Sequence, residues 1–303
     1  MANMRYSASR KRALIGKWAV ALACAAAICA AVLLLYLLLR PKDERSVPTI
    51  AQQDKIIYNN QVFEIVEGIE KQSYEIDCFK MKDGILTYDD KDTETFFGVD
   101  VSEFQDYIDW KQVKSDGADF AMLRVGWRGN TEGKLNKDEH FNKNIKSALA
   151  AGLHVGVYFY SQAVTPQEAA EEARAVIRWI EAYDIKYPVV YDWEYVSAEA
   201  RTANVTPEVL GQCANAFCAE IEKAGYIPMI YLYLQSAYVH YNIADIAKYD
   251  FWLAEYTDKP SFYYDYKMIQ YTNKGKIAGI EEEIDLNLCF VDYAKLSKER
   301  ARG

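Results

Sequence analysis

Short apolar segments recur along the chain from Phe96 onward, and segments with helical character separate them. Each apolar segment has the length of one buried strand. Strands that alternate with helices favour a parallel sheet with helices packed on its outer face. We therefore predict an α/β fold, an irregular (β/α) barrel, over residues 96–303. The eight expected strands are 96–101, 119–125, 153–160, 187–193, 227–233, 250–255, 267–271 and 283–288.

Two of the segments between strands carry signals for the start of a helix. Thr165-Pro166-Gln167-Glu168 combines an N-cap, a proline in the first turn and a glutamate three residues after the cap. Thr206-Pro207-Glu208 opens a second helix, which Gly225 closes. The alternative fold is an open doubly wound sheet, which normally carries a glycine-rich phosphate loop after its first strand. Residues 99–102 are Val-Asp-Val-Ser and lack the glycines of such a loop.

The first forty residues contain no acid, and an uncharged apolar run extends from Trp18 to Leu39. This run of 22 residues is long enough to cross a bilayer as a helix. Basic residues precede it, so we expect the N-terminus to stay in the cytoplasm and the remainder to lie outside the cell. The expected parts are a basic cytoplasmic tail at 1–12, a transmembrane signal anchor at 13–39 and a stalk at 40–55.

A cleaved signal peptide and a lipoprotein modified at Cys24 are the alternatives for this run. Small residues at 23–31 could offer a cleavage site, but a further apolar stretch, 32–39, follows them. A cleavage site belongs after the apolar core of a signal peptide and not within it. The sequence therefore favours an uncleaved anchor and a single-pass protein of the cell membrane.

Residues 56–95 alternate apolar and polar side chains in short stretches, which predicts a small β extension before the barrel. Asp83-Gly84 lies between the segments 74–81 and 85–88, where a hairpin turn would fall. The extension supplies none of the acids at the strand ends of the barrel. We therefore expect a chain that starts near Thr93 to fold and keep its chemistry.

The charge and the metal-binding residue types exclude several function classes. After residue 40, 29 basic residues stand against 44 acidic ones, a net charge of about −15, whereas a nucleic-acid-binding protein needs a basic surface. The six cysteines show no metal-ligand spacing and imply no disulfide framework. His140, His154 and His240 are far apart in the sequence, which argues against a metal site or a His-based triad. We expect no cofactor, no metal and no nucleic-acid partner.

Carboxylates gather at the C-terminal ends of the expected strands, where the active site of a barrel lies. The strongest of these signals is the run 189–194, Val-Val-Tyr-Asp-Trp-Glu, in which an apolar strand ends in two acids. Side chains alternate across a strand, so Asp192 and Glu194 share one face with their Cα atoms about 6–7 Å apart. Trp193 points the other way. Two carboxyl groups at this spacing can serve as the catalytic pair of a glycosidase.

Other acidic, polar and aromatic residues stand at or next to the same strand ends. Asp100 and Asp285 lie in the first and last strands, and Glu255 ends the sixth. Aromatic rings at such positions suit stacking on sugar rings. The residues expected to bind substrate are Arg124, Tyr158, Tyr160, Tyr231, Trp252, Tyr256 and Gln270.

These motifs together resemble one family, the muramidases (lysozymes) of glycoside hydrolase family 25. Residues 98–105 (Gly-Val-Asp-Val-Ser-Glu-Phe-Gln), followed by Ile108-Asp109-Trp110, are similar to the family's opening motif G-I-D-V-S-x-x-Q … I-D-W. Residues 188–194 match the strand that ends in the D-x-E pair. Further segments that resemble the family, in the same order, are 119–124, 151–158, 225–231, 251–256, 270–272 and 284–287.

The resemblance implies a hydrolase of peptidoglycan glycan strands that cuts the β-1,4 bond between N-acetylmuramic acid and N-acetylglucosamine. By position it implies Glu194 as the acid/base, Asp192 as its partner, and Asp100 and Asp285 as further acids of the site. Asp192 could attack the anomeric carbon or stabilise a cyclic intermediate formed by the N-acetyl group of the substrate. The family pattern favours the second route, with retention of configuration.

Two departures from the family pattern bear on which glycan is accepted. Trp127-Arg128-Gly129 replaces the small residues that usually follow the second strand, and Tyr160 adds a second tyrosine at the end of the third. Two other functions stay open at this point. One is a non-catalytic wall-binding protein, and the other is an envelope-assembly protein in which cutting is incidental.

The two central acids should differ in protonation. They share a face, so the charge of one raises the cost of ionising the other. Glu194 has the longer side chain and stands one step further out, which suits contact with the leaving oxygen. We therefore expect Glu194 to hold its proton and Asp192 to stay ionised.

Overall fold

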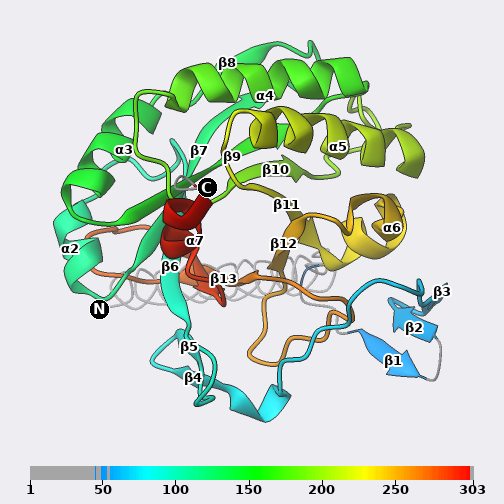
Figure 1. Cartoon of the computed structure of the whole chain (residues 1–303), viewed down its shortest axis with the longest axis horizontal. Helices are drawn as coiled ribbons and strands as arrows, with labels where there is room; N and C mark the ends of the chain where they lie inside the picture. The colour runs from blue at the N-terminus through cyan, green and yellow to red at the C-terminus, as the bar shows by residue number, and fades with distance from the viewer. Residues whose placement is uncertain (1–44, 46–48, 53–54, 301–303) are drawn as a thin grey trace, which may run out of the picture. The chain divides into compact units, whose positions relative to one another are not determined.

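The computed structural model describes residue 45 and residues 49–52 and 55–300 (Figure 1). The cytoplasmic tail at 1–12 and the anchor at 13–39, both expected from the sequence, lie outside these residues. Within the part of the chain that is described, no helix is long and apolar enough to cross a membrane.

Eight strands form a closed ring in the order β6-β14-β13-β12-β11-β10-β9-β7, and β7 pairs with β6 to complete it. This closure confirms the barrel and excludes the open doubly wound sheet. The strands are β6 Phe96–Val101, β7 Phe120–Arg128, β9 His154–Ser161, β10 Val189–Trp193, β11 Pro228–Tyr233, β12 Asp250–Ala254, β13 Met268–Gly275 and β14 Ile284–Cys289.

The ring is irregular at β14, which runs antiparallel to both of its neighbours, β13 and β6. The reason is the length of the connection. Only residues 276–283 join β13 to β14, and a parallel crossover needs about a dozen residues or more. A short strand that the sequence did not predict, β8 (Leu135–Lys137), pairs antiparallel with the end of β7.

The two longest helices begin where the sequence predicts them. The Thr165 side chain accepts from the Glu168 N–H at the start of α4, and the Thr206 side chain accepts from the Val209 N–H at the start of α5. Gly225 has φ of 87°, the left-handed conformation that ends α5. The helices are α2 Trp110–Ser115, α3 Phe141–Ala150, α4 Pro166–Ile180, α5 Pro207–Lys223, α6 Ile243–Ile246 and α7 Tyr293–Arg300, with a π-helical turn at Ser236–His240.

Buried side chains fill the interior of the barrel. Gly98 shows how tight this packing is, since a Cβ placed there would lie 2.4 Å from the buried ring of Phe120. Trp193 points out of the barrel, as the strand alternation predicts, and its ring contacts those of His240 and Tyr241. The neighbouring residues of β10, at even numbers, therefore face the interior.

The β extension consists of two small sheets. β1 (Ile50–Gln52), β2 (Lys55–Tyr58) and β3 (Gln61–Glu64) form one antiparallel sheet, so the extension begins within the expected stalk. After a 3-10 turn at Ile76–Cys78, β4 (Phe79–Lys82) and β5 (Ile85–Tyr88) form a hairpin. Its turn is Asp83-Gly84, both with positive φ, as the sequence predicts for a primed turn.

The extension covers the side of the barrel on which no long helix of the described residues packs. α3, α4 and α5 pack on the outside of β7, β9, β10 and β11, whereas the β4–β5 hairpin lies near β6 and contacts β14 (Figure 1). Tyr74 donates from its hydroxyl to the Tyr266 carbonyl at 2.7 Å, and its ring stacks on Phe290 with centroids 4.0 Å apart. The apolar outer face of β13 and β14 is thereby removed from water, so the extension is part of the barrel's packing.

Leu86→Ala should therefore destabilise the whole chain. Leu86, in β5, is 0% exposed and belongs to the same apolar cluster as the outer residues of β13 and β14. We expect the free energy of unfolding to fall by about 2–5 kcal/mol, in one cooperative transition, in urea denaturation. Val62→Ala, in the same extension but 59% exposed, should change it by less than about 0.5 kcal/mol. Two separate transitions would mean that the extension folds independently.

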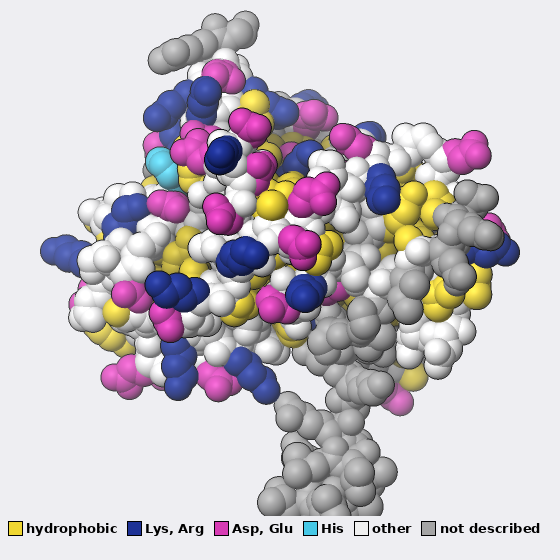
Figure 2. Space-filling view, turned by 90° about the horizontal axis from the view of Figure 1, so that it is seen from below, with side chains coloured by type: hydrophobic (Ala, Val, Ile, Leu, Met, Phe, Trp, Pro, Cys, Tyr) yellow, Lys and Arg dark blue, Asp and Glu magenta, His cyan; other side chains and the backbone are white. Residues whose placement is uncertain are grey.

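Acidic and basic side chains are mixed on the surface. Figure 2 shows Asp and Glu interspersed with Lys and Arg over the described part of one face. The acids of interest are instead concentrated at one end of the barrel interior.

Candidate active site

Two adjoining cavities open at the C-terminal ends of the barrel strands. The first has a volume of about 290 Å³ and the second about 220 Å³, and they share Asp100, Tyr158, Asp192, Glu194 and Asp285. The first is lined in addition by Arg45, Tyr231, Trp252, Tyr256, Gln270 and Asn273, and the second by Val101, Ser102, Phe104, Gln105, Arg124 and Tyr160. The four acids assigned to catalysis and all seven residues expected to bind substrate line one cavity or both.

Asp192 and Glu194 stand where the two cavities meet. Asp192 is paired in register with Tyr160 of β9 and Tyr231 of β11, which fixes it in the centre of the sheet. It is 5% exposed, whereas the side chain of Glu194, one residue past the end of β10, is 23% exposed. The carboxyl of Glu194 is therefore the one that lies closer to the open rim.

Burial raises the pKa of Asp192. Burial and the neighbouring charge of Glu194 raise the pKa of Asp192 well above its usual range, against the opposing charges of Arg45 and Arg124. No described group forms a hydrogen bond with its Oδ1 atom, which is buried. Burial and the charge of Glu194 thus oppose the ionised form that the sequence predicts for Asp192, whereas the two arginines favour it.

Asp100 and Asp285 face each other across the antiparallel pair β6–β14 and share a hydrogen bond. Burial raises the pKa of Asp100 to about 6, although two amides donate to it, Gln270 Nε2 at 3.0 Å and Asn287 Nδ2 at 2.7 Å. Burial and the charge of Asp100 raise the pKa of Asp285 to about 9. The burial of both carboxyls and their mutual repulsion therefore favour retention of a proton within the pair.

Two hydrogen-bond chains end at Asp100. Tyr231 and Tyr256 donate from their hydroxyls to Gln270 Oε1 at 3.0 and 3.2 Å, which turns the amide nitrogen of Gln270 toward Asp100. On the other side, Trp252 Nε1 donates to Asn287 Oδ1 at 2.8 Å. These chains hold the aromatic residues of the first cavity in fixed orientations around its acids.

Arg124 forms one wall of the second cavity. Glu103 and Asp138 pair with its guanidinium at 3.0 and 2.9 Å, and the rings of Phe104 and Trp127 lie 5.0 and 4.7 Å from it. The Trp127 departure from the family pattern thus packs against a site residue. Arg128 lines neither cavity, since it turns into a buried network with Glu172. Phe104 is exposed at the mouth.

Comparison with known proteins assigns this arrangement to a family. Residues 99–280 match the family model described as glycosyl hydrolases family 25. The chain belongs to glycosyl hydrolases family 25. This confirms the resemblance read from the motifs, and the family is one of glycoside hydrolases. Asp285, Asn287 and Arg45 lie outside the matched range.

Curated relatives of the family 25 chain resemble it at moderate identity. An uncharacterised protein, YegX, of Escherichia coli K12 is 26% identical over 199 residues, which cover 64% of this chain and 69% of that protein. Lysozyme M1 of Streptomyces globisporus is 26% identical over 210 residues, which cover 65% of this chain and 68% of that protein.

Solved structures show the same fold. A family 25 glycosyl hydrolase of Bacillus anthracis has a TM-score of 0.57 at 24% identity, and the match covers 69% of this chain and 94% of that chain. The modular autolysin LytC of Streptococcus pneumoniae has a TM-score of 0.56 at 22% identity, and the match covers 80% of this chain and 57% of that chain.

Besides the residues at the start of the second cavity (Val101, Ser102, Phe104 and Gln105), three residues of the site were not predicted from the sequence. Asn287 is fully buried and donates to Asp100; its position two residues after Asp285, on the same face of the strand, could have indicated it. Asn273 lies in β13, three residues after Gln270, and lines the first cavity. Arg45 lies in the expected stalk, where no periodicity marks it.

Arg45 places a positive charge among the acids. It forms an ion pair with Glu194, its guanidinium lies 5.0 Å from the ring of Tyr233 and 5.9 Å from that of Tyr256, and its carbonyl accepts from the Tyr256 N–H at 3.2 Å. Among the described residues that line the first cavity, Arg45 is the only one with a basic side chain. Its charge opposes the rise in pKa of both Asp192 and Asp285.

Glu255, which the sequence also places at a strand end, has a different role. Its carboxylate accepts from Ser261 and from the backbone N–H groups of Ser261 and Phe262, and it lines neither cavity. It fixes the loop after β12. Within the described residues, no three His, Cys, Asp or Glu side chains are grouped so that they could hold a metal ion.

Arg45→Met should move the acidic limb of the pH–rate profile to higher pH. The guanidinium favours the ionised forms of Asp192 and Asp285, so its removal raises both pKa values, and a step that needs either carboxylate ionised then requires a higher pH. Lys186→Met is the matched control, since its side chain is 25% exposed against 24% for Arg45 and lines neither cavity. An unmoved limb in Arg45→Met would show that this charge does not act on the catalytic acids.

Proposed function

We propose that this family 25 enzyme is an N-acetylmuramidase that hydrolyses the β-1,4 bond between N-acetylmuramic acid and N-acetylglucosamine in peptidoglycan. The observation that carries the proposal is the pair formed by buried Asp192 and the more open Glu194, at the junction of two cavities on the barrel axis. A bond cut at this junction would have one sugar in each cavity.

The walls of the two cavities suit a glycan. Trp252 lines the first cavity and Tyr158 lines both, and their rings meet edge to face with centroids 6.0 Å apart. Polar groups surround these rings, including the Gln270 amide and the Arg124 guanidinium. Sugar rings combine apolar faces with hydroxyl edges, so rings and hydrogen-bonding groups together match their chemistry.

In the proposed mechanism, Glu194 acts as the acid/base. Protonated, it donates to the glycosidic oxygen as the bond to the anomeric carbon breaks, and the resulting carboxylate later takes a proton from water. Its partly open position at the rim supports this role, because the leaving sugar and the incoming water both pass there. Its ion pair with Arg45 opposes protonation, so the pair must separate before the proton is donated.

We assign Asp192 to stabilisation of a cyclic intermediate that the N-acetyl group of the substrate forms. Its buried Oδ1 has no hydrogen-bond partner among the described residues, and an acetamido N–H is a donor that would supply one. That hydrogen bond and the positive charge developing on the sugar would both favour the ionised carboxylate. Direct attack of Asp192 on the anomeric carbon is the alternative route.

The proposal is tested by incubating the full chain with purified peptidoglycan and measuring soluble fragments and new reducing ends. We expect both to appear together. If the protein sediments with the walls and releases neither, a non-catalytic wall-binding function holds instead. If a deletion phenotype is restored by Glu194→Gln as well as by the wild type, cutting is incidental to a role in envelope assembly.

We also propose that residues 13–39 anchor the enzyme in the membrane, with the barrel outside the cell. The uncharged run and the basic residues before it support this orientation. Protease added to spheroplasts should remove the barrel and leave a small stub in the membrane fraction. A mature N-terminus beyond residue 30 would contradict the anchor.

A further inference from the structure

Glu194 lies just beyond the end of β10, and two side chains hold the peptide group that follows it. Gln162 Nε2 donates to the Glu194 carbonyl at 3.0 Å, and Tyr233 accepts at its hydroxyl from the Tyr195 N–H at 3.3 Å. The carbonyl and the N–H of the 194–195 peptide thus both form hydrogen bonds with side chains at the ends of the neighbouring strands, β9 and β11. These bonds restrain the backbone from which the Glu194 side chain extends.

The orientation of the Gln162 amide is determined by its partners. Gln162 is fully buried, and its Oε1 accepts from the Thr202 hydroxyl at 2.7 Å. Its Nε2 donates to the Ser161 carbonyl at 2.9 Å as well as to the Glu194 carbonyl. A reversed amide would place its oxygen against two carbonyl oxygens, so only one orientation satisfies the site.

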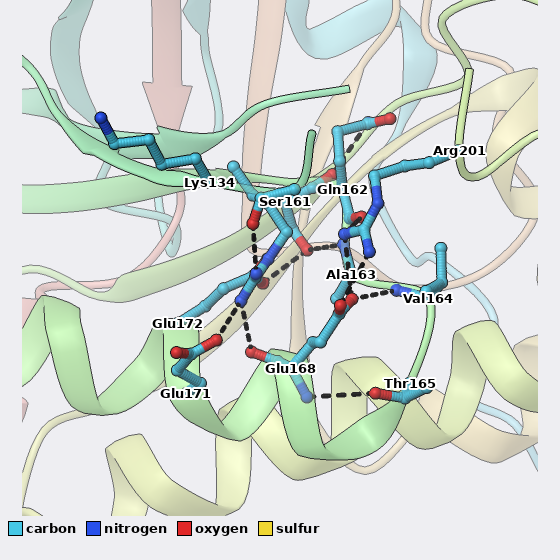
Figure 3. A network of polar contacts seen from close by, with 12 residues as sticks. Lys134, Ser161, Gln162, Ala163, Val164, Thr165, Glu168, Glu171, Glu172 and Arg201 are labelled. Carbon is cyan, nitrogen blue, oxygen red and sulfur yellow. Dashed lines mark hydrogen bonds and ion pairs between the residues drawn. The ribbon is translucent and has the colours of Figure 1, made fainter. Parts of the chain in front are cut away.

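The backbone of Gln162 is held by the buried network drawn in Figure 3. Arg201 Nη1 donates to the Gln162 carbonyl at 2.9 Å and to Glu168 Oε2 at 3.0 Å, and Arg201 Nη2 donates to Glu168 Oε1 at 2.7 Å. Ser161 donates to Glu172 at 2.6 Å, and Glu172 accepts from Arg128 Nε, also at 2.6 Å. The network joins the ends of β7 and β9, the start of α4 and the loop after Glu194, so Gln162 extends from a rigid support.

We propose that Gln162 is a positioning residue for Glu194, a role that rests on the proposed function of Glu194 as the acid/base. Gln162 lines neither cavity, so it acts through the Glu194 backbone and not by contact with substrate. Proton donation needs the carboxyl within hydrogen-bond reach of the glycosidic oxygen. A displacement of about 1 Å can lower a rate by about 100-fold.

The test compares two substrates in Gln162→Met, which keeps an unbranched side chain and removes the donor. On peptidoglycan we expect kcat/KM to fall roughly 10–100-fold. On an aryl glycoside with a very good leaving group, bond breaking needs little protonation, so kcat/KM should stay close to that of the wild type. A fault in overall structure would lower both. Gln162→Glu, which keeps the shape but replaces the amide nitrogen by oxygen, should show the same selective loss at neutral pH.

Asn144→Leu is the matched control. Asn144 is a buried amide of α3 that accepts from Trp110 Nε1 at 3.4 Å and lies outside this network, so its replacement should lower the melting temperature without changing the ratio of the two kcat/KM values. Equal losses on both substrates in the Gln162 variants, or no loss on either, would overturn the positioning role. If Glu194→Gln itself keeps its activity, the proposed role of Glu194 as the acid/base fails. The role of Gln162 then fails with it.

Discussion

Glu194→Gln is expected to lower turnover on peptidoglycan by roughly 10²–10⁴-fold. The amide keeps the size of the side chain but cannot donate the proton that the leaving oxygen needs. The melting temperature should change by no more than about 2 °C, because the side chain is partly exposed and its ion pair with Arg45 lies at the rim. Initial rates of reducing-end release and calorimetry measure the two effects.

Glu220→Gln is the control for this variant. Glu220 is also partly exposed and pairs with an arginine, Arg174, at 3.2 Å, but it lies on α5, away from both cavities. Its turnover should equal that of the wild type. Near-normal turnover in Glu194→Gln would place the acid elsewhere and end the assignment of this site.

Asp192→Asn should also lose activity by roughly 10²–10⁴-fold, for a different reason. The transition state develops positive charge, and the neutral amide cannot stabilise it. The stability of the folded state should not fall with the activity. Because burial raises the pKa of Asp192, its ionised form destabilises the folded state as the pH rises through that pKa, and asparagine removes this effect. The melting temperature at neutral pH should therefore match or exceed that of the wild type.

A substrate with a very good leaving group separates the two roles. It needs little protonation, so it should partly restore kcat/KM in Glu194→Gln and leave Asp192→Asn impaired. Restoration of Asp192→Asn in place of Glu194→Gln would mean that the two residues exchange roles.

The barrel and the positions of its acids could be predicted from the sequence because they depend on short-range patterns. The alternation along β10 places Asp192 and Glu194 on the inner face and Trp193 outside, as observed. The threonine caps of α4 and α5 and the Asp83-Gly84 turn are equally local. The antiparallel direction of β14 was harder to predict, because it depends on the length of the loop between β13 and β14.

The environment of the acids depends on long-range packing, which the sequence does not display. A position at a strand end does not reveal how deeply a carboxyl is buried, so the sequence did not show that burial raises the pKa of Asp192. Arg45 comes from a segment with no pattern and meets Glu194 149 positions later in the chain. Gln162 likewise donates to the backbone carbonyl of Glu194, 32 positions away, and no sequence motif indicates this contact.

The extension at 56–95 lines neither cavity, and it packs against the barrel. The apolar outer face of β13 and β14 requires a cover, because no long helix of the described chain packs on it. The strands of the extension could be predicted from the sequence. That the outer face of β13 and β14 needs a cover could not.

The most direct test of the proposed activity is the identity of the new chain ends. Peptidoglycan digested by the full chain is reduced with borohydride, and the soluble fragments are analysed by mass spectrometry. Cleavage of the proposed bond predicts reduced N-acetylmuramic acid at the ends, absent from digests with Glu194→Gln. Reduced N-acetylglucosamine, or anhydro ends without new reducing sugars, would contradict a muramidase.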